Sequence, residues 1–349
     1  MNKSRILGWT LLAFIIYCTL GAVVYFASLL ALQKGVRLDV PWFQSTQKSL
    51  YRRGMVNVNS WLGIPGCITA DPDLIYKPSN GTCKFDDIEF KTTLGFTDEG
   101  RNTGAKPAGT GIAVIGDSHA MGWGVNDRET FSARLQTLSG RPVYNLGVAS
   151  YGTARELIRL EKSGVLDKVD TVIIQYCNND LNENLGFDTA SKQDLHEKVF
   201  GGAPKNPPRP NRFKLIAKGY GLALAAPFRS LSESLRRRNF TPHYAPLVDV
   251  IAQHGDTLEG KRVIVFYSNP YGQRYRNFPS GPDANMPSVN FFDLGLGPSD
   301  YYKLDNHMTP EGHRKAAERL FRHLRAARPD LEEALNKSTF VIPAEAGIQ

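Results

Sequence analysis

No charged residue occurs between Ile6 and Leu32. About 20 apolar residues suffice to span a bilayer as a helix, and this run is longer. A cleaved signal peptide has a shorter apolar core that ends at a small-residue cleavage site, whereas this run continues past Ala27 and Ser28. We therefore expect an uncleaved transmembrane signal anchor over residues 6–32.

The charges that flank this run favour one orientation. Lys3, Arg5 and the terminal amine precede the run, and Lys34 and Arg37 follow it. Because cytoplasmic flanks carry an excess of positive charge, the count slightly favours a cytoplasmic N-terminus. Residues 1–5 would then form a short cytoplasmic tail, and the rest of the chain would lie outside the cytoplasm, in a periplasm.

Cysteine is scarce, with four residues in 349. Cys18 lies inside the apolar run, and Cys177 follows the apolar stretch TVIIQY, which predicts a buried thiol. Cys67 and Cys83 flank a loop rich in turn residues, and in an oxidising compartment they would close a disulfide worth ~3 kcal/mol. The alternative is two unpaired thiols. No second Cys or His pair lies nearby at ligand spacing, so a zinc site is not expected, and nothing else predicts a metal or a cofactor.

The chain also lacks internal repeats and any recognised nucleic-acid-binding motif. With 42% hydrophobic and 22% charged residues it is ordinary globular material, which excludes disorder as the default. The net charge of +8 favours anionic partners. Acidic residues are nearly absent from residues 198–238, which hold ten Lys or Arg and only Glu233. This segment is either a solvated basic face or a rim that meets anionic lipid or an anionic polymer; nucleic acid is not the expected partner.

Residues 33–105 read as a membrane-proximal segment, in which CKFDDIEFKTTLGF alternates in polarity like a half-buried strand. The pattern changes at about residue 106, where short apolar, β-branched runs begin. These runs are 111–115, 142–146, 171–176, 262–267 and 288–294. Buried parallel strands have this composition.

Helical patterns lie between most of these strands. One begins at Asp127 and ends at Gly140, another ends at Gly164, and a third opens with Thr309 and Pro310 after the last strand. Alternating strands and helices predict an α/β sandwich around a parallel sheet over 106–330. About 85 residues separate the third and fourth predicted strands, which is more than a simple crossover needs, so residues 181–260 are predicted to contain an insertion. Residues 331–349 are predicted to form a C-terminal tail.

Chemically useful residues follow the predicted strands. Ser118 follows the first strand, Gly147 the second, Asn179 the third, and Asp305 with His307 the fifth. Because parallel strands bring their carboxyl ends to one edge of a sheet, these groups are expected to meet there. Taken alone, each residue has an ordinary structural explanation, such as a helix N-cap or a turn glycine. The prediction rests on the order of these residues along the chain.

Together these groups form a set suited to acyl transfer. Ser118 becomes a nucleophile when a base takes its proton, and His307 can act as that base near neutral pH. Asp305 can hold the imidazole and stabilise its cationic form. The Ser118 and Gly147 backbone N–H groups and the Asn179 side-chain amide could stabilise the oxyanion. His119 and His313 are expected to be structural.

The blocks GDSH, NLGVASYGT, CNND and KLDNH resemble those of the SGNH hydrolase superfamily, also called GDSL-like hydrolases, over residues 111 to about 327. The resemblance implies a flavodoxin-like three-layer α/β/α fold. It also implies Ser118 as nucleophile, Gly147 and Asn179 as oxyanion donors, and Asp305 and His307 as the rest of a triad.

These blocks differ from the family pattern in two residues and in one spacing. His119 stands in place of the usual Leu, and Cys177 stands where the third block has Gly. In the late block Asp305 and His307 are separated by one residue, whereas two is the commoner spacing.

The expected function is a membrane-anchored, extracytoplasmic serine esterase that acts on O-acyl esters, acetyl above all, of cell-envelope carbohydrate. An O-acyltransferase with a sugar hydroxyl as acceptor would use the same acyl-Ser118 intermediate. A lipase or thioesterase, and a non-catalytic glycan-binding domain, are the remaining alternatives. The partners expected are an ester-bearing carbohydrate or lipid, the membrane, and proteins of envelope assembly.

Overall fold

The computed structural model describes residues 3–54, 61–177, 179–201, 212–236, 245–268, 281–283, 286 and 288–326. The predicted tail 331–349 and parts of the predicted basic insertion, 202–211 and 237–244, lie outside the described residues.

Helices and strands alternate through most of the described chain. The helices are α1 (Lys3–Gln33), α2 (Pro41–Arg52), α3 (Ser118–Met121), α4 (Phe131–Ser139), α5 (Thr153–Lys162), α6 (Asp180–Thr189), α7 (Lys192–Phe200), α8 (Arg212–Arg236), α9 (Ala245–Gln253), α10 (Gly255–Leu258) and α11 (Pro310–Ala326). The strands are β1 (Ile68–Asp71), β2 (Ile75–Pro78), β3 (Gly81–Asp86), β4 (Lys91–Thr97), β5 (Gly100–Arg101), β6 (Gly111–Ile115), β7 (Val143–Asn145), β8 (Val169–Tyr176), β9 (Arg262–Tyr267), β10 (Gly281–Pro282) and β11 (Val289–Phe292).

The main sheet of the described residues has the strand order β10-β11-β9-β8-β6-β7-β5-β4-β3. The strands β7, β6, β8, β9 and β11 are parallel to one another. Numbered along the chain, these five strands have the order 2-1-3-4-5, which is that of flavodoxin-like folds. The predicted α/β fold with a parallel sheet is therefore confirmed, and each of the five predicted strands is present within one or two residues of its expected bounds.

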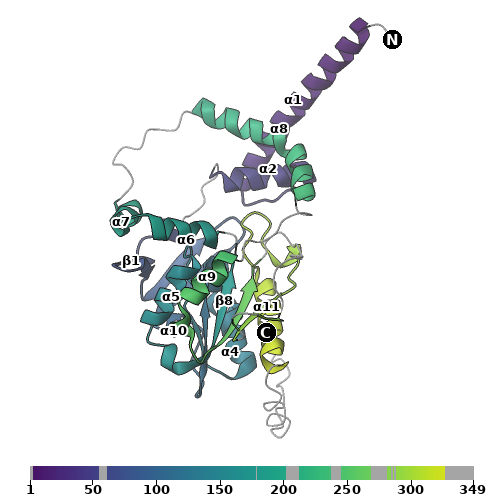
Figure 1. Ribbon diagram of the computed structural model, residues 1–349. Helices are drawn as coiled ribbons and strands as arrows, with labels where there is room; N and C mark the ends of the chain where they lie inside the picture. The colour runs from purple at the N-terminus through teal and green to yellow at the C-terminus, as the bar shows by residue number, and fades with distance from the viewer. Residues whose placement is uncertain are drawn as a thin grey trace, which may run out of the picture.

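Helices cover both faces of this sheet, which gives three layers (Figure 1). On one face Leu157 and Leu160 of α5 and Leu247 of α9 pack against the strands. On the other face Leu135 of α4 and Leu320 of α11 do the same. The strands between them are buried on both sides, which explains why their sequences are apolar without alternation.

Strands β3, β4 and β5 precede residue 106 and yet belong to the same sheet. In β4 Thr92, Leu94 and Phe96 are buried, and the residues between them are exposed or half-buried. This alternation is the half-buried strand pattern of the sequence, and it comes from an antiparallel hairpin at the sheet edge. The sheet therefore continues across the predicted boundary between residues 105 and 106.

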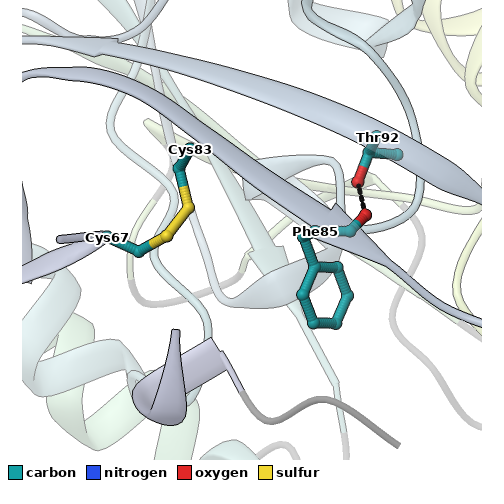
Figure 2. The surroundings of a disulfide bond; sticks show 4 residues. All are labelled: Cys67, Cys83, Phe85 and Thr92. Atoms are coloured by element: carbon teal, nitrogen blue, oxygen red, sulfur yellow. Dashed lines mark hydrogen bonds between the residues drawn. A yellow bond between two sulfur atoms is a disulfide. The ribbon is translucent and has the colours of Figure 1, made fainter. Parts of the chain in front are cut away.

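A disulfide joins Cys67 to Cys83, as the sequence predicted (Figure 2). Both cysteines are buried beside Phe85 and Trp61. In the adjacent ladder the Thr92 hydroxyl donates a hydrogen bond to the Phe85 carbonyl. The disulfide thus ties the segment before β1 to strand β3. Cys177 is a buried free thiol, as expected.

Replacing both Cys67 and Cys83 by Ala is expected to lower the free energy of unfolding by ~3 kcal/mol, because a loop of 16 residues is no longer closed in the unfolded chain. For a domain of this size the melting temperature should fall by about 6–12 °C. Reductant should lower the melting temperature of the wild type by the same amount and leave that of the double variant unchanged. A wild type that is insensitive to reductant would contradict the prediction.

Helix α1 projects from the sheet domain, and α2 and α8 pack beside its C-terminal part (Figure 1). Its 31 residues are long and apolar enough to cross a membrane. Such a helix is about 46 Å long, whereas the hydrocarbon core is about 30 Å thick. The buried residues of α1 lie between Gly21 and Leu32, so the surplus length is used for packing against protein. A side chain at Gly21 would collide with Leu224 of α8.

The predicted insertion divides into two kinds of helix. Helix α9 places Leu247 and Ile251 in the core, so it is the crossover helix between β8 and β9. Helix α8 leaves the sheet and packs against α1 and α2 instead. The three helices share a hydrophobic cluster that includes Val24, Leu50 and Leu222.

Candidate active site

The nucleophile candidate lies on a sharp turn between β6 and α3. Gly116 has φ 148°, in a region that side chains rarely adopt. A Cβ there would lie 2.6 Å from the Ala120 methyl group, so the turn requires glycine. Asp117 is the N-cap of α3, and its carboxylate accepts a hydrogen bond from the His119 N–H. Ser118 is therefore presented at the carboxyl edge of the sheet.

The turn is fixed from the neighbouring strand by a buried glutamine. Oε1 of Gln175, on β8, accepts hydrogen bonds from the N–H groups of Asp117 and Ala120, both at 3.0 Å. Since Gln175 is fully buried, these bonds are shielded from competing water. They set the position of the Ser118 backbone relative to the sheet.

The structure brings together Ser118, His307 and Asp305. The distance between Ser118 Oγ and His307 Nε2 is 2.7 Å. On the other side of the ring His307 Nδ1 is hydrogen-bonded to Asp305 Oδ1. This is the order of groups that a serine nucleophile, a general base and an orienting carboxylate require.

The one-residue spacing between Asp305 and His307 is accommodated by Asn306. This residue has φ 71°, a left-handed conformation that asparagine tolerates better than most side chains. As a result Asp305 Oδ1 also accepts the backbone N–H of His307 at 3.2 Å. The carboxylate thus holds both the backbone and the imidazole of the residue that it orients.

The Glu89 carboxylate holds the loop that carries Asp305 and His307. It accepts the N–H groups of Leu304 at 2.7 Å and Asp305 at 2.9 Å, and that of Lys303 at 3.1 Å. The Glu89 side chain is 1% exposed and is also paired with Arg37. Charge-assisted bonds to three successive amides make this loop rigid before any substrate binds.

Tyr51 and Trp123 complete the surroundings of Asp305 and His307. The Tyr51 hydroxyl, at the end of α2, donates to Asp305 Oδ2 at 3.0 Å, and the Trp123 indole N–H donates to the same oxygen at 3.3 Å. The Trp123 ring stacks on the His307 ring with centroids 5.3 Å apart. Asp305 therefore has partners at both oxygens, as a buried carboxylate requires.

The electrostatics of the pair favour a charged His307. Burial alone would lower the pKa of His307, but the adjacent Asp305 carboxylate raises it above its usual value. Burial likewise raises the pKa of Asp305, and His307 together with the Tyr51 hydroxyl lowers it below its usual range. This pair of charges would thus stabilise an imidazolium at His307.

His119 lies beside His307 and is not the expected base for Ser118. Its ring is buried, and its centroid lies 4.7 Å from that of His307. Burial and the nearby His307 charge lower the pKa of His119 to about 4, so it is neutral at pH 7. His313 is also buried, and its Nδ1 accepts the N–H of Phe131 at 3.1 Å, which anchors α11 to α4.

Two of the three predicted oxyanion donors, Asn179 and Gly147, already donate hydrogen bonds within the protein. The Asn179 side-chain amide donates to Asp117 Oδ2 at 3.1 Å and is also hydrogen-bonded to the Glu183 carboxylate, so one of these bonds would have to break before it could bind an oxyanion. The N–H of Gly147 donates to the Asn145 side chain at 3.0 Å, so this bond would have to break before Gly147 could bind an oxyanion. A Cβ at Gly147 would collide with the backbone of Met121, which gives this glycine a packing role as well.

A buried cluster of possible metal ligands lies beside the turn. Asp117, Cys177 and Asp180 bring one ligand atom each within 4.8 Å of one another. The Cys177 thiol donates to Asp117 Oδ2 at 3.0 Å, and the Cys177 N–H donates to Asp180 Oδ2 at 2.8 Å. Burial raises the pKa of the Cys177 thiol and of Asp180 well above their usual values. The three groups thus form an internal hydrogen-bond network beside the turn.

The chain matches no protein-family model and no curated protein. It is similar to the solved structure of a G-D-S-L family lipolytic protein from Desulfitobacterium hafniense, with 13% identity, a TM-score of 0.33, and coverage of 61% of this chain and 98% of the other. It is also similar to a family 2 carbohydrate esterase from Corynascus thermopiles, with 13% identity, a TM-score of 0.35, and coverage of 66% and 70%. A third similar structure is a carbohydrate acetylesterase family member from Sinorhizobium meliloti, with 16% identity, a TM-score of 0.29, and coverage of 62% and 98%.

Of these three proteins, the one from Desulfitobacterium hafniense carries the G-D-S-L name. At identities of 13–16% and TM-scores of 0.29–0.35 the likeness does not transfer an activity to this chain. The function is therefore inferred from the distances and charges around Ser118.

Sequence patterns did not indicate that Tyr51, Glu89 or Trp123 belongs to this site. Tyr51 and Asp305 are 254 positions apart, and Glu89 and Leu304 are 215 apart. No periodicity or motif links residues at such separations. A buried acidic residue in an otherwise alternating segment, as Glu89 proves to be, is a signal only once its burial is known.

The pH profile of the site can be predicted from the pKa of His307. The base must be neutral to accept the Ser118 proton, and the pKa of His307 lies above 6.5. Reaction of Ser118 with a fluorophosphonate should therefore slow as the pH falls, with its midpoint above pH 6.5. The rate of fluorophosphonate labelling, measured at several pH values between 4 and 9, tests this dependence. A midpoint near pH 4 would instead assign the base to His119.

Proposed function

We propose that this protein is a serine esterase that works through an acyl-Ser118 intermediate. The observation that carries the proposal is the continuous hydrogen-bonded chain from Ser118 through His307 to Asp305. Any one of these residues has an ordinary structural explanation, but a hydroxyl 2.7 Å from an imidazole that is oriented by a buried carboxylate is the arrangement of a nucleophile and its base.

In the acylation step Ser118 Oγ attacks the ester carbonyl carbon, and His307 Nε2 takes the Ser118 proton. The carbonyl oxygen becomes an oxyanion, for which the Ser118 N–H and the Asn179 side-chain amide are the proposed donors. His307 then gives its proton to the departing alcohol, and the acyl group remains on Ser118. Asp305 stays ionised and holds the imidazolium throughout.

In the deacylation step water takes the place of the alcohol. His307 removes a proton from the water, which attacks the acyl carbon. As the intermediate collapses, the bond to Ser118 Oγ breaks and His307 gives that proton to Ser118 Oγ. The products are the free acid and the original enzyme. A sugar hydroxyl in place of water would give a transferase by the same steps.

The proposed substrates are acetyl esters of carbohydrate outside the cytoplasm. The His307 side chain is only 18% exposed, which favours a short acyl group over a long one. The half-buried Trp123 ring offers an aromatic surface beside the reacting atoms, of the kind that packs against a sugar ring. The disulfide and the apolar helix α1 support a membrane-anchored location in an oxidising compartment.

The test compares acyl chain length and acceptor with the full chain in detergent. Hydrolysis of p-nitrophenyl acetate should exceed that of the octanoate ester by at least tenfold. With a soluble oligosaccharide present, acetate release should exceed acetyl transfer; the reverse would identify a transferase. Absence of turnover with both esters, together with absence of fluorophosphonate labelling, would overturn the proposal in favour of a binding domain.

A further inference from the structure

A cavity of about 620 Å³ lies between α2, α8 and the segment that precedes His307. Its size is that of a pocket for a small molecule or a lipid headgroup. Basic side chains dominate its charged lining: Arg37, Lys48, Arg52, Arg53, Arg229 and Lys303. Asp39 is the one acidic residue among the described lining residues.

Two of the six cations that line the cavity have carboxylate partners among the described ion pairs, and Arg53 and Arg229 have none there. Arg37 is paired with Glu89, and Lys303 is paired with Asp39 at 2.9 Å. Arg229 is held by neutral groups instead, since its guanidinium donates to Ser49 Oγ at 3.2 Å and to the Leu222 carbonyl at 3.0 Å. A positioned guanidinium without a carboxylate on it is a ready donor for a phosphate.

The surroundings of the cavity point to a lipid as the source of that phosphate. Tyr17 of α1 stacks on Trp42 at 5.6 Å and contacts Phe228, so three aromatic side chains gather where α1, α2 and α8 meet. Aromatic side chains of this kind mark the membrane–water interface. Phe228, which directly precedes Arg229 in α8, is 67% exposed.

The cavity also shares a wall with the loop that carries the base. Lys303, Leu304 and Asn306 line it, whereas Asp305 and His307 of the same loop contact the Ser118 side. The Arg37–Glu89 pair joins the two, because Glu89 holds the amides of residues 303–305. A ligand in the cavity would thus lie against the loop that carries Asp305 and His307.

We infer that this cavity binds the phosphate of a membrane lipid, with Arg53 and Arg229 as its principal cations and the acyl chains directed toward α1 and the apolar side of α8. The inference concerns binding and holds whether or not Ser118 turns over esters. Its consequence is that the site would be loaded from the membrane surface.

The test measures lipid adducts of the full chain in neutral detergent by native mass spectrometry. The probe is dihexanoyl phosphatidic acid, and the comparison ligands are dihexanoyl phosphatidylcholine and inorganic phosphate. The variants are Arg53→Gln and the double variant Arg53→Gln/Arg229→Gln. Lys84→Gln/Lys91→Gln is the matched control, because it removes two exposed charges on β3 and β4.

Phosphatidic acid should bind the wild type at least tenfold more tightly than phosphatidylcholine. Affinity should fall about fivefold in Arg53→Gln and about 25-fold in the double variant, and it should be unchanged in the control. Arg53 is exposed, so its single variant remains informative even if the loss of the Arg229 hydrogen bonds unfolds α8. Equal binding of the two lipids, no loss in Arg53→Gln, or binding of inorganic phosphate as tight as that of phosphatidic acid would each overturn the inference.

Discussion

Replacing Ser118 by Ala is expected to abolish both fluorophosphonate labelling and ester hydrolysis. Removing the nucleophile of a serine hydrolase typically lowers kcat by about 10⁶-fold and leaves only the contribution of binding and oxyanion stabilisation. His307 would lose the hydroxyl that lies 2.7 Å from its Nε2, while its contact with Asp305 would remain. The fold should therefore persist, and the melting temperature should change by no more than 2–3 °C.

Three measurements separate loss of chemistry from loss of structure. Labelling reports the nucleophile, turnover reports the whole cycle, and the melting temperature reports the fold. Ser79→Ala is the matched control, because Ser79 is half-buried and follows β2, away from the turn of Ser118. Full labelling of the Ser118→Ala variant would show that another residue is the nucleophile.

The parts of the fold that sequence could predict are those with a local cause. The five parallel strands lie between two layers of helices, so each is a short and mostly apolar run that composition reveals. The sharp turn of Ser118 has its own local signal in Gly116, whose conformation few other residues could adopt. The disulfide was predictable because its two cysteines are the pair that flanks a single loop.

The parts that sequence could not predict depend on contacts between distant segments. The packing of α2 and α8 against α1 brings Tyr51 to Asp305, and nothing local to Tyr51 indicates that partner. The position of β3–β5 in the main sheet is also non-local, because it rests on the single residue pair Arg101–Asn145 between β5 and β7. Both features connect the membrane-proximal segment to the loop that carries Asp305 and His307. The sequence prediction treated these as separate segments and therefore did not anticipate the contacts between them.

Arg101 is the residue with the largest expected effect on stability. Its side chain is fully buried, and its guanidinium donates to the carbonyls of Met121, Gly122 and Val125 at 2.5–2.6 Å and to Asp127 at 3.1 Å. Burial lowers the pKa of Arg101 to about 10, so it remains charged at neutral pH. These bonds fix the loop that directly follows α3 and carries Trp123.

Arg101→Met is expected to lower the free energy of unfolding by about 3–5 kcal/mol, because three buried carbonyls and one carboxylate lose their donor. For a domain of this size the melting temperature should fall by about 6–20 °C. Turnover below that temperature should also fall, since Trp123 stacks on His307 and donates to Asp305.

Two further variants define the cause of the Arg101→Met effect. Arg101→Lys keeps the charge but loses the planar fork of donors, so its loss should lie between those of the wild type and Arg101→Met. Arg128→Met removes an exposed guanidinium from the same segment and should change the free energy of unfolding by less than about 0.5 kcal/mol. Thermal unfolding of the three variants in the same detergent measures the series. If Arg101→Met melted within 2 °C of Arg128→Met, the buried guanidinium would not be what holds this loop, and the position of Trp123 over His307 would need another cause.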